Sequence, residues 1–423
     1  MMVTLTKRML SKSFSKVKFK FTHLDWDELN SFDFGLYIHV PFCRMFCSFC
    51  PFYKVRYDEK LKKKYIQGLK KEIRMSRIEG KASWLYIGGG TPNLLTAGEI
   101  SEILAYVKEF VALGEVGMEG NPTRFTPEYL EEISNSGIHK ISIGIESFQP
   151  ATLKAVNRAG VTEEFIRKIV DHAQSLGISV NIDLMVGLPK QNTQGCLRDA
   201  ETIANIKPNQ VTIYPFLVIP GVKAEPSMSS QQMFETIEGA WNILKHHGYK
   251  RNSIWVFSKN GRIYDSAKDE LVSDYLGFGP AAFSTCGNVQ VVNPPIELYL
   301  RMLKQDKRLA FRSELDKKAT VWRQFSHELY KLRIDPTIIK KMPFSVKLVL
   351  HLLRATGNVQ GLRVTDKGRY FVHEITKTVV ESLPFPLSNP KTIENRTEYE
   401  EVLKTSQKKE PIAREERAPR VVV

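Results

Sequence analysis

Between residues 35 and 216, short apolar runs alternate with amphipathic stretches. This alternation is typical of repeated βα units, in which parallel strands form a sheet and helices cover it. The predicted strands are 36–40, 84–87, 116–119, 141–145, 180–185 and 211–214. The predicted helices are about 58–78, 97–111, 126–136, 162–175 and 193–205. Six units are fewer than the eight of a closed barrel, so the sequence predicts an α/β fold of the partial (β/α)6 TIM-barrel type.

Five segments differ in composition and define the predicted domains. Residues 1–33 form a basic N-terminal arm, 34–228 the partial barrel, and 229–314 an extension that closes it. Residues 315–384 combine helical and strand patterns and predict a small C-terminal α+β domain that is winged-helix-like. From 385 to 423 the chain is polar and mixed in charge, so this tail is expected to be mostly disordered.

The chain carries a net charge of +15, which invites a nucleic-acid or membrane partner. Residues 1–24 contain six lysines and arginines, no acid, and several interleaved Met, Leu and Phe side chains. Such an arm either touches an anionic membrane surface or is a disordered leader. A second basic stretch, 60–81, has apolar residues at helical spacing and is interpreted as the solvated face of a helix. No nucleic-acid partner is therefore expected.

Hydrophobic residues make up 42% of the chain, charged residues make up 25%, and no apolar run is long enough to span a bilayer. This composition is ordinary for a soluble enzyme. Five cysteines and the lack of an apolar leader favour a reducing cytoplasm, where thiols bind metal more often than they form disulfides. We expect a cytoplasmic protein, with peripheral membrane contact through the N-terminal arm left open.

Three cysteines, Cys43, Cys47 and Cys50, follow the first predicted strand in the stretch YIHVPFCRMFCSFCPFY. Their CxxxCxxC spacing is one residue wider in its first gap than that of a zinc knuckle. A structural zinc site would need a fourth ligand, for which His39 or a distant cysteine is the candidate. Three thiolates on one loop fit a cubane 4Fe-4S cluster that leaves one iron without a protein ligand. A zinc site and simple packing of small side chains remain the alternatives.

Other notable motifs also follow predicted strands, where parallel sheets gather their chemistry. They are GGGTP after the second strand, EGNP after the third, Glu146 after the fourth and GLPKQ after the fifth. The cysteine loop with the glycine run resembles the radical S-adenosylmethionine (SAM) superfamily. The order of LYIHVPFC, LYIGGGTPNLL, EGNP, GIHKISIGIESF, VNRAG and VNIDLMVGLPKQN is similar to the oxygen-independent coproporphyrinogen III oxidase group, over roughly residues 34–300. That group includes related heme chaperones and class C radical SAM methyltransferases.

The resemblance implies a 4Fe-4S cluster held by Cys43, Cys47 and Cys50, and SAM bound at its open iron. Cleavage of SAM then yields methionine and a 5′-deoxyadenosyl radical that takes a hydrogen atom from the substrate. An electron donor such as flavodoxin or ferredoxin is implied as a partner. The catalytic candidates are Tyr37, against the SAM sulfonium, and Glu119, which accepts from ribose hydroxyls.

Further SAM contacts are implied by position. Gly89, Gly90 and Thr91 let the backbone approach the methionine amino group. Polar parts of SAM are assigned to Arg158 and Asp183, and Phe49 resembles the aromatic residue whose backbone contacts a second SAM. Leu217 falls near a position that contacts the adenine of SAM. Glu146 lies at a position where the oxidase has glutamine, so a carboxylate replaces an amide there. Whether one or two SAM molecules bind is left open.

Two departures bear on which member of the group this is. The oxidase would need an extended N-terminal segment with substrate residues, and the heme chaperone would read HNxxYW where this chain has YDSAKDELVSDYLGFGP. Both departures favour a class C methyltransferase that methylates an sp² carbon of a conjugated ring. The basic arm favours a menaquinone-type quinone as acceptor. A tetrapyrrole-directed enzyme, acting in anaerobic heme degradation or like the oxidase, and a heme chaperone without catalysis are the alternatives.

Overall fold

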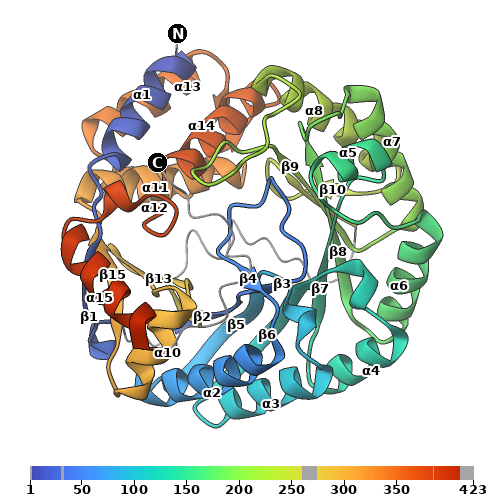
Figure 1. Cartoon of the computed structure of the whole chain (residues 1–423). Coiled ribbons are helices and arrows are strands. Elements are labelled where there is room, and N and C mark those ends of the chain that lie inside the picture. Colours follow the sequence, from blue (N-terminus) through green and yellow to red (C-terminus); the bar gives the residue numbers. More distant parts are fainter. Residues whose placement is uncertain (1, 30–32, 260–273, 384, 410–423) are drawn as a thin grey trace.

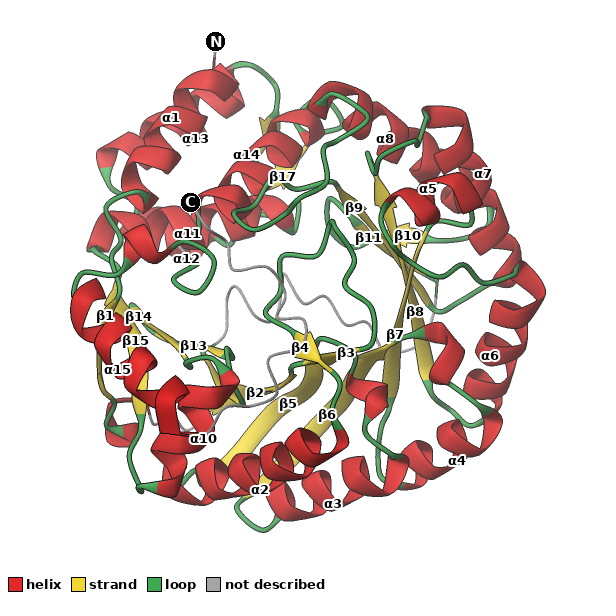
Figure 2. Cartoon of the chain, in the orientation of Figure 1, coloured by secondary structure: helices red, strands yellow, loops and turns green. Residues whose placement is uncertain are grey.

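The computed structural model describes residues 2–29, 33–259, 274–383 and 385–409, and is built around one sheet of 13 strands (Figure 1). In the order of pairing, the strands are β1 (Lys20–His23), β15 (Leu309–Glu314), β14 (Val289–Val292), β13 (Phe283–Cys286), β12 (Tyr275–Phe278), β2 (Asp33–Val40), β5 (Gly80–Gly89), β6 (Val111–Gly120), β7 (Lys140–Glu146), β8 (Ser179–Val186), β9 (Gln210–Pro215), β11 (Val256–Ser258) and β10 (Lys250–Arg251). Helices surround the strands in Figure 2. The predicted α/β class is confirmed.

The six predicted strands lie together as β2, β5, β6, β7, β8 and β9, and every pair of neighbours is parallel. Each observed strand contains the predicted one. On one side, β12 continues the sheet in parallel with β2, and antiparallel strands follow. On the other side, β11 and β10 are antiparallel to their neighbours. The segment expected to close the barrel therefore extends the same sheet.

The predicted helices connect the parallel strands. They are α2 (Glu59–Ser76), α3 (Ala97–Lys108), α4 (Pro127–Asn135), α6 (Glu163–Ser175) and α7 (Thr193–Ile206). Side chains cap each N-terminus: Asp58, Thr96, Thr126, Thr162 and Asn192 each accept a hydrogen bond from a backbone N–H of the first turn. These caps explain why the helices begin where the sequence predicts.

Shorter elements and the later helices complete the chain. They are α1 (Met2–Phe14), α5 (Pro150–Ala155), α8 (Ser230–His246), α10 (Ile296–Lys304), α11 (Lys317–Tyr330), α12 (Pro336–Lys341), α13 (Phe344–Ala355), α14 (Arg369–Ser382) and α15 (Arg396–Lys409); the 3-10 turns Trp26–Leu29, Pro92–Leu94, Pro122–Arg124 and Pro390–Thr392; and the paired short strands β3 (Phe42–Cys43) with β4 (Val55–Arg56) and β16 (Val359–Gln360) with β17 (Arg363–Val364). No described helix has both the length and the apolar character that a membrane span requires.

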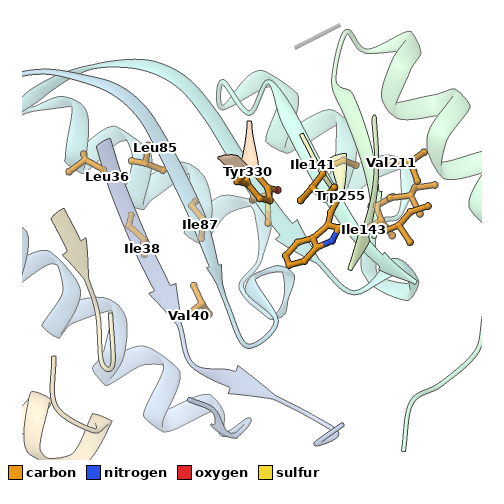
Figure 3. Packing of buried hydrophobic residues seen from close by; sticks show 14 of the residues in the cluster. Leu36, Ile38, Val40, Leu85, Ile87, Ile141, Ile143, Val211, Trp255 and Tyr330 are labelled. Atoms are coloured by element: carbon orange, nitrogen blue, oxygen red, sulfur yellow. The ribbon is translucent and has the colours of Figure 1, made fainter. Parts of the chain in front are cut away.

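The core lies between the sheet and its helices. Figure 3 shows Leu36, Ile38 and Val40 of β2 beside Leu85 and Ile87 of β5, all at most 1% exposed. Burial of each such side chain contributes roughly 1.5–3 kcal/mol. Since neighbouring strand residues point to opposite faces, the residues between these apolar positions point to the inner face of the sheet.

Residues 2–29 of the N-terminal arm are folded, so of the two alternatives for this arm the disordered leader is wrong. Helix α1 packs against α14 and α11, with Leu10 and Phe14 buried. Strand β1 pairs with β15, and Phe21 contacts Tyr399 with ring centroids 5.2 Å apart. The apolar side chains that suggested membrane contact are used for packing within the fold.

The C-terminal segments are also folded. Helices α11 to α14 and the β16–β17 hairpin lie in the segment for which a small α+β domain was predicted, and α14 packs against α8 of the preceding segment. The expected disorder from residue 385 is wrong as far as 409, because Ile393 and Tyr399 are buried against Phe19 and Phe21. Residues 410–423 lie outside the described residues. Because most residues of this tail are polar or charged, its composition did not indicate that Ile393 and Tyr399 would pack against Phe19 and Phe21.

Candidate active site at the carboxyl ends of the strands

The predicted site residues gather at one edge of the parallel sheet. Tyr37 lies near the end of β2, Gly89 ends β5, Glu119 lies near the end of β6, Glu146 ends β7 and Asp183 lies on β8. The carboxyl ends of adjacent parallel strands share an edge, so these residues face a common region. The cysteine loop with β3 and β4 lies in front of the middle of the sheet in Figure 1.

The cysteine loop is fastened at several points. Its two ends join as parallel strands β3 and β4, and Tyr57 N donates to Cys43 O at 3.0 Å. Cys50 N donates to Cys47 O at 3.3 Å, which makes a tight turn. Ser48 N donates to Val156 O at 3.1 Å, and Asn157 Nδ2 donates to Phe46 O at 3.0 Å. The segment after β7 therefore holds the loop over the sheet.

The three thiols are the donor set of the candidate cluster. Burial raises the pKa of the Cys43 thiol to about 11, and the nearby Cys50 and Cys47 add to this effect. Within the described ranges, no three His, Cys, Asp or Glu side chains could hold one metal ion. In a cubane each thiolate binds a different iron, so the thiolates stand further apart than the ligands of one ion. The donor set fits a 4Fe-4S cluster with three protein ligands.

The glycine run places backbone close to the cysteine loop. Gly89 has φ +115°, and a Cβ there would lie 2.8 Å from His39 Cε1. A Cβ on Gly90 would lie 2.6 Å from Phe42 O. Gly89 N donates to Glu119 Oε1 at 2.6 Å, and Thr91 Oγ1 lies 3.4 Å from Cys43 Sγ. Only glycine fits at these two positions, because the neighbouring atoms leave no room for a side chain.

His39 orients Tyr37. Its Nε2 lies 3.0 Å from Tyr53 O, and its Nδ1 lies 3.2 Å from Tyr37 Oη. Burial lowers the pKa of His39 to about 4, so the ring is neutral at neutral pH. Because a carbonyl only accepts, Nε2 carries the proton and Nδ1 accepts from the tyrosine hydroxyl. Both ring nitrogens are engaged, which argues against His39 as the fourth zinc ligand.

Arg158 connects the cysteine loop with β7. Its Nη1 donates to Cys47 Sγ at 3.6 Å, and its Nη2 donates to Gly144 O and lies 3.4 Å from Glu146 Oε1. The guanidinium also lies 6.0 Å from the ring centroid of Phe49. Glu146 sits at an irregularity of β7 with φ +68°. Burial raises the pKa of Glu146 to about 7 although Arg158 opposes the shift.

Asp183 belongs to a polar network on the inner face of the sheet that the sequence did not reveal. It accepts from Ser142 Oγ at 2.6 Å and from Asn181 Nδ2 at 2.8 Å, while Thr212 Oγ1 donates to Asn181 Oδ1 at 3.0 Å. Burial raises the pKa of Asp183. Polar residues at alternate positions of otherwise apolar strands were the signal that could have identified this network.

Two further features singled out in the sequence are Leu217 and the segment YDSAKDELVSDYLGFGP. Leu217 is half-buried in the loop after β9, and its neighbour Val218 donates its N–H to Glu381 Oε1 at 2.8 Å. The segment 260–273, which contains the first part of YDSAKDELVSDYLGFGP, lies outside the described residues. The described remainder, 274–280, includes Gly279, whose N–H donates to Glu72 Oε2 at 2.8 Å.

Residues 37–203 match the family model of the radical SAM superfamily. Oxygen-independent coproporphyrinogen III oxidase of Escherichia coli K12 is 26% identical over 384 residues, which are 81% of this chain and 84% of that protein. Heme chaperone HemW of Buchnera aphidicola subsp. Schizaphis graminum is 26% identical over 379 residues, 82% of this chain and 98% of that protein.

The solved structure of coproporphyrinogen III oxidase (HemN) from Escherichia coli has a similar fold, with a TM-score of 0.70 and 24% identity. The match covers 82% of this chain and 90% of that one. The predicted resemblance to the coproporphyrinogen oxidase group is confirmed. Neither the coproporphyrinogen III oxidase nor the heme chaperone is named as a methyltransferase.

Proposed function

We propose that this protein is a radical SAM enzyme that acts on a tetrapyrrole. The relatives that match about four fifths of the chain are named for a porphyrinogen oxidase and a heme chaperone. The preference for a quinone rested on the basic N-terminal arm, whose apolar side chains pack inside the fold. The same finding weakens the argument against an oxidase, because the N-terminal segment is structured.

The observation that carries the proposal is the convergence of three thiols, the Gly89–Glu119 contact and Arg158 at one edge of the sheet. Cys43, Cys47 and Cys50 would hold the cluster, which when bound supplies the electron that cleaves SAM. Gly89 lets the backbone pass close to the His39 ring and donate its N–H to Glu119.

Glu119 accepts from Gly89 N through Oε1, which holds this carboxylate at the carboxyl end of β6, where it would accept from ribose hydroxyls. Arg158 supplies a positive charge beside the thiols. Tyr37, held by His39, presents its ring on the inner face of the sheet. Its ring and hydroxyl are therefore oriented before any ligand arrives.

The surface of the cysteine loop favours a flat apolar substrate with acidic edges. Met45 is 48% exposed and Phe52 is 58% exposed, and both are close in sequence to the cluster cysteines. Arg44 and Arg56 are also exposed. Apolar side chains suit the face of a macrocycle, and arginines suit its carboxylates.

The test uses anaerobically reconstituted protein with SAM and a chemical reductant. We expect 5′-deoxyadenosine to form, and coproporphyrinogen III or heme to be consumed with it. Heme binding without SAM cleavage would overturn the proposal in favour of a chaperone. S-adenosylhomocysteine formed with a menaquinone analogue would overturn it in favour of a methyltransferase.

Variants separate cluster chemistry from folding. Cys47→Ser should lose most cluster iron and all SAM cleavage. The matched control is Cys196→Ser, on α7, because Cys196 is another free thiol, 5% exposed, that lies outside the cysteine loop. It should keep both properties.

A further inference from the structure

Helix α13 presents two large apolar side chains to solvent. Phe344 is 80% exposed and Leu348 is 43% exposed. They are four residues apart, so they lie on the same side of the helix, one turn from each other. Phe344 has the largest exposed fraction among the large apolar residues of the described ranges.

The other side of α13 already anchors the helix. Val346, Val349, Leu350 and Leu353 are at most 2% exposed and belong to the main hydrophobic core. Phe344 and Leu348 therefore take no part in the hydrophobic core of this module. Exposed apolar side chains that a fold does not use commonly mark a contact surface.

The surroundings of this pair are strongly basic. Residues 336–365 contain five lysines and arginines and no Asp or Glu: Lys340, Lys341, Lys347, Arg354 and Arg363. Lys340 and Lys341 are exposed at the end of α12, and Lys347 and His351 are exposed on α13 beside Leu348. We call these six exposed side chains, Lys340, Lys341, Phe344, Lys347, Leu348 and His351, the α12–α13 face. In Figure 1, α13 lies near the outer edge of the molecule.

We propose that the α12–α13 face binds an anionic lipid surface. Lysines at its edge attract acidic headgroups, and Phe344 and Leu348 enter the boundary between headgroups and acyl chains. An α-helix that reads DNA bases places polar side chains outward, whereas this one places Phe and Leu at the centre of its basic patch. Peripheral membrane contact, which the sequence left open for the N-terminal arm, is thereby assigned to a different part of the chain.

The test is sedimentation of the full-length protein with lipid vesicles. Vesicles of phosphatidylcholine with phosphatidylserine should bind at least tenfold more protein than phosphatidylcholine alone, and added salt should reduce the binding. The variant Phe344→Ser/Leu348→Ser should bind at least tenfold less. Lys340→Glu/Lys341→Glu/Lys347→Glu should abolish the preference for phosphatidylserine.

Matched controls change the same residue types elsewhere. Phe165, 39% exposed on α6, is replaced in Phe165→Ser, and two exposed lysines of α2 are reversed in Lys63→Glu/Lys64→Glu. Both should bind vesicles like the unchanged protein. Absence of vesicle binding, or equal binding by all variants, overturns the proposal. So does binding of duplex DNA or an acidic protein, with no vesicle binding, that is lost in the α12–α13 variants. This inference is independent of the proposed enzymatic function.

Discussion

Arg158 and Glu146 form a largely buried ion pair, with 3.4 Å between Nη2 and Oε1, and the same guanidinium donates to the thiol of Cys47 at 3.6 Å. Glu146 therefore offsets a positive charge beside Cys47, one of the three proposed cluster ligands. The oxidase that the sequence resembles has glutamine at this position.

Replacing Glu146 with glutamine should raise the reduction potential of the reconstituted cluster by tens of millivolts. The variant leaves Arg158 uncompensated, and positive charge favours the state that has gained an electron. An anaerobic redox titration followed by electron paramagnetic resonance measures the shift. It is done at about pH 8.5, because the pKa of Glu146 is raised to about 7.

Two controls accompany this titration. Glu146→Asp keeps the charge and should keep the potential closer to that of the unchanged protein. The second control, Asp199→Asn, removes a buried carboxylate that is not paired with Arg158. Asp199 accepts hydrogen bonds from Ser147 Oγ at 2.6 Å and from Phe148 N at 3.2 Å. An unchanged or more negative potential in Glu146→Gln would contradict the charge argument.

Replacing Gly89 with alanine should weaken SAM binding at least tenfold. The new Cβ would lie 2.8 Å from His39 Cε1 and push the ring away from Tyr37. Equilibrium dialysis with labelled SAM measures the loss. The control is Gly177→Ala, which also has positive φ, +76°, but meets nothing within 4 Å. If both variants lose the same affinity, backbone strain and not the contact with His39 is responsible.

Replacing Glu72 with alanine should destabilise the protein by about 3–5 kcal/mol. Glu72 is 1% exposed and accepts from Tyr299 Oη at 2.7 Å and Asn293 Nδ2 at 2.8 Å. Its loss leaves Arg308, 7% exposed, as an uncompensated buried charge. Urea unfolding measures the change in free energy. The control is Glu102→Ala, which removes an exposed partner of Lys70 and should cost less than about 1 kcal/mol. Similar losses in both variants would contradict the role of burial.

Replacing His373 with glutamine should make stability less sensitive to acid. Burial lowers the pKa of His373 to about 4 from 6.5, and its Nδ1 accepts from Trp255 Nε1 at 3.3 Å. Because the pKa of His373 is lower in the folded protein than in the unfolded chain, acid favours the unfolded chain. The contribution of His373 to stability is therefore fully present above pH 6.5 and is lost as the pH falls toward 4. Between pH 8 and pH 5, the unchanged protein should lose about 2 kcal/mol through this group. Unfolding curves at both pH values test this, and an equal loss in the variant would rule it out.

The fold was predictable where the signal was local. Apolar runs fix the strands, and Asp58, Thr96 and Thr162 fix helix starts, because capping depends on a few neighbouring residues. The prediction failed at the two ends of the chain. Phe21 and Tyr399 bury each other although they come from segments of charged composition, and composition does not show a partner that is distant in sequence.

The sequence by itself determined the six parallel strands, the three cysteines on one loop and the glycines that follow the second of these strands. These are short-range patterns, fixed by residue type and spacing. Only the tertiary structure decided that Arg158 reaches Cys47, 111 residues away, and that His39 aligns Tyr37 through the carbonyl of Tyr53. Such contacts depend on how the strands and loops pack together, and no local spacing encodes that arrangement.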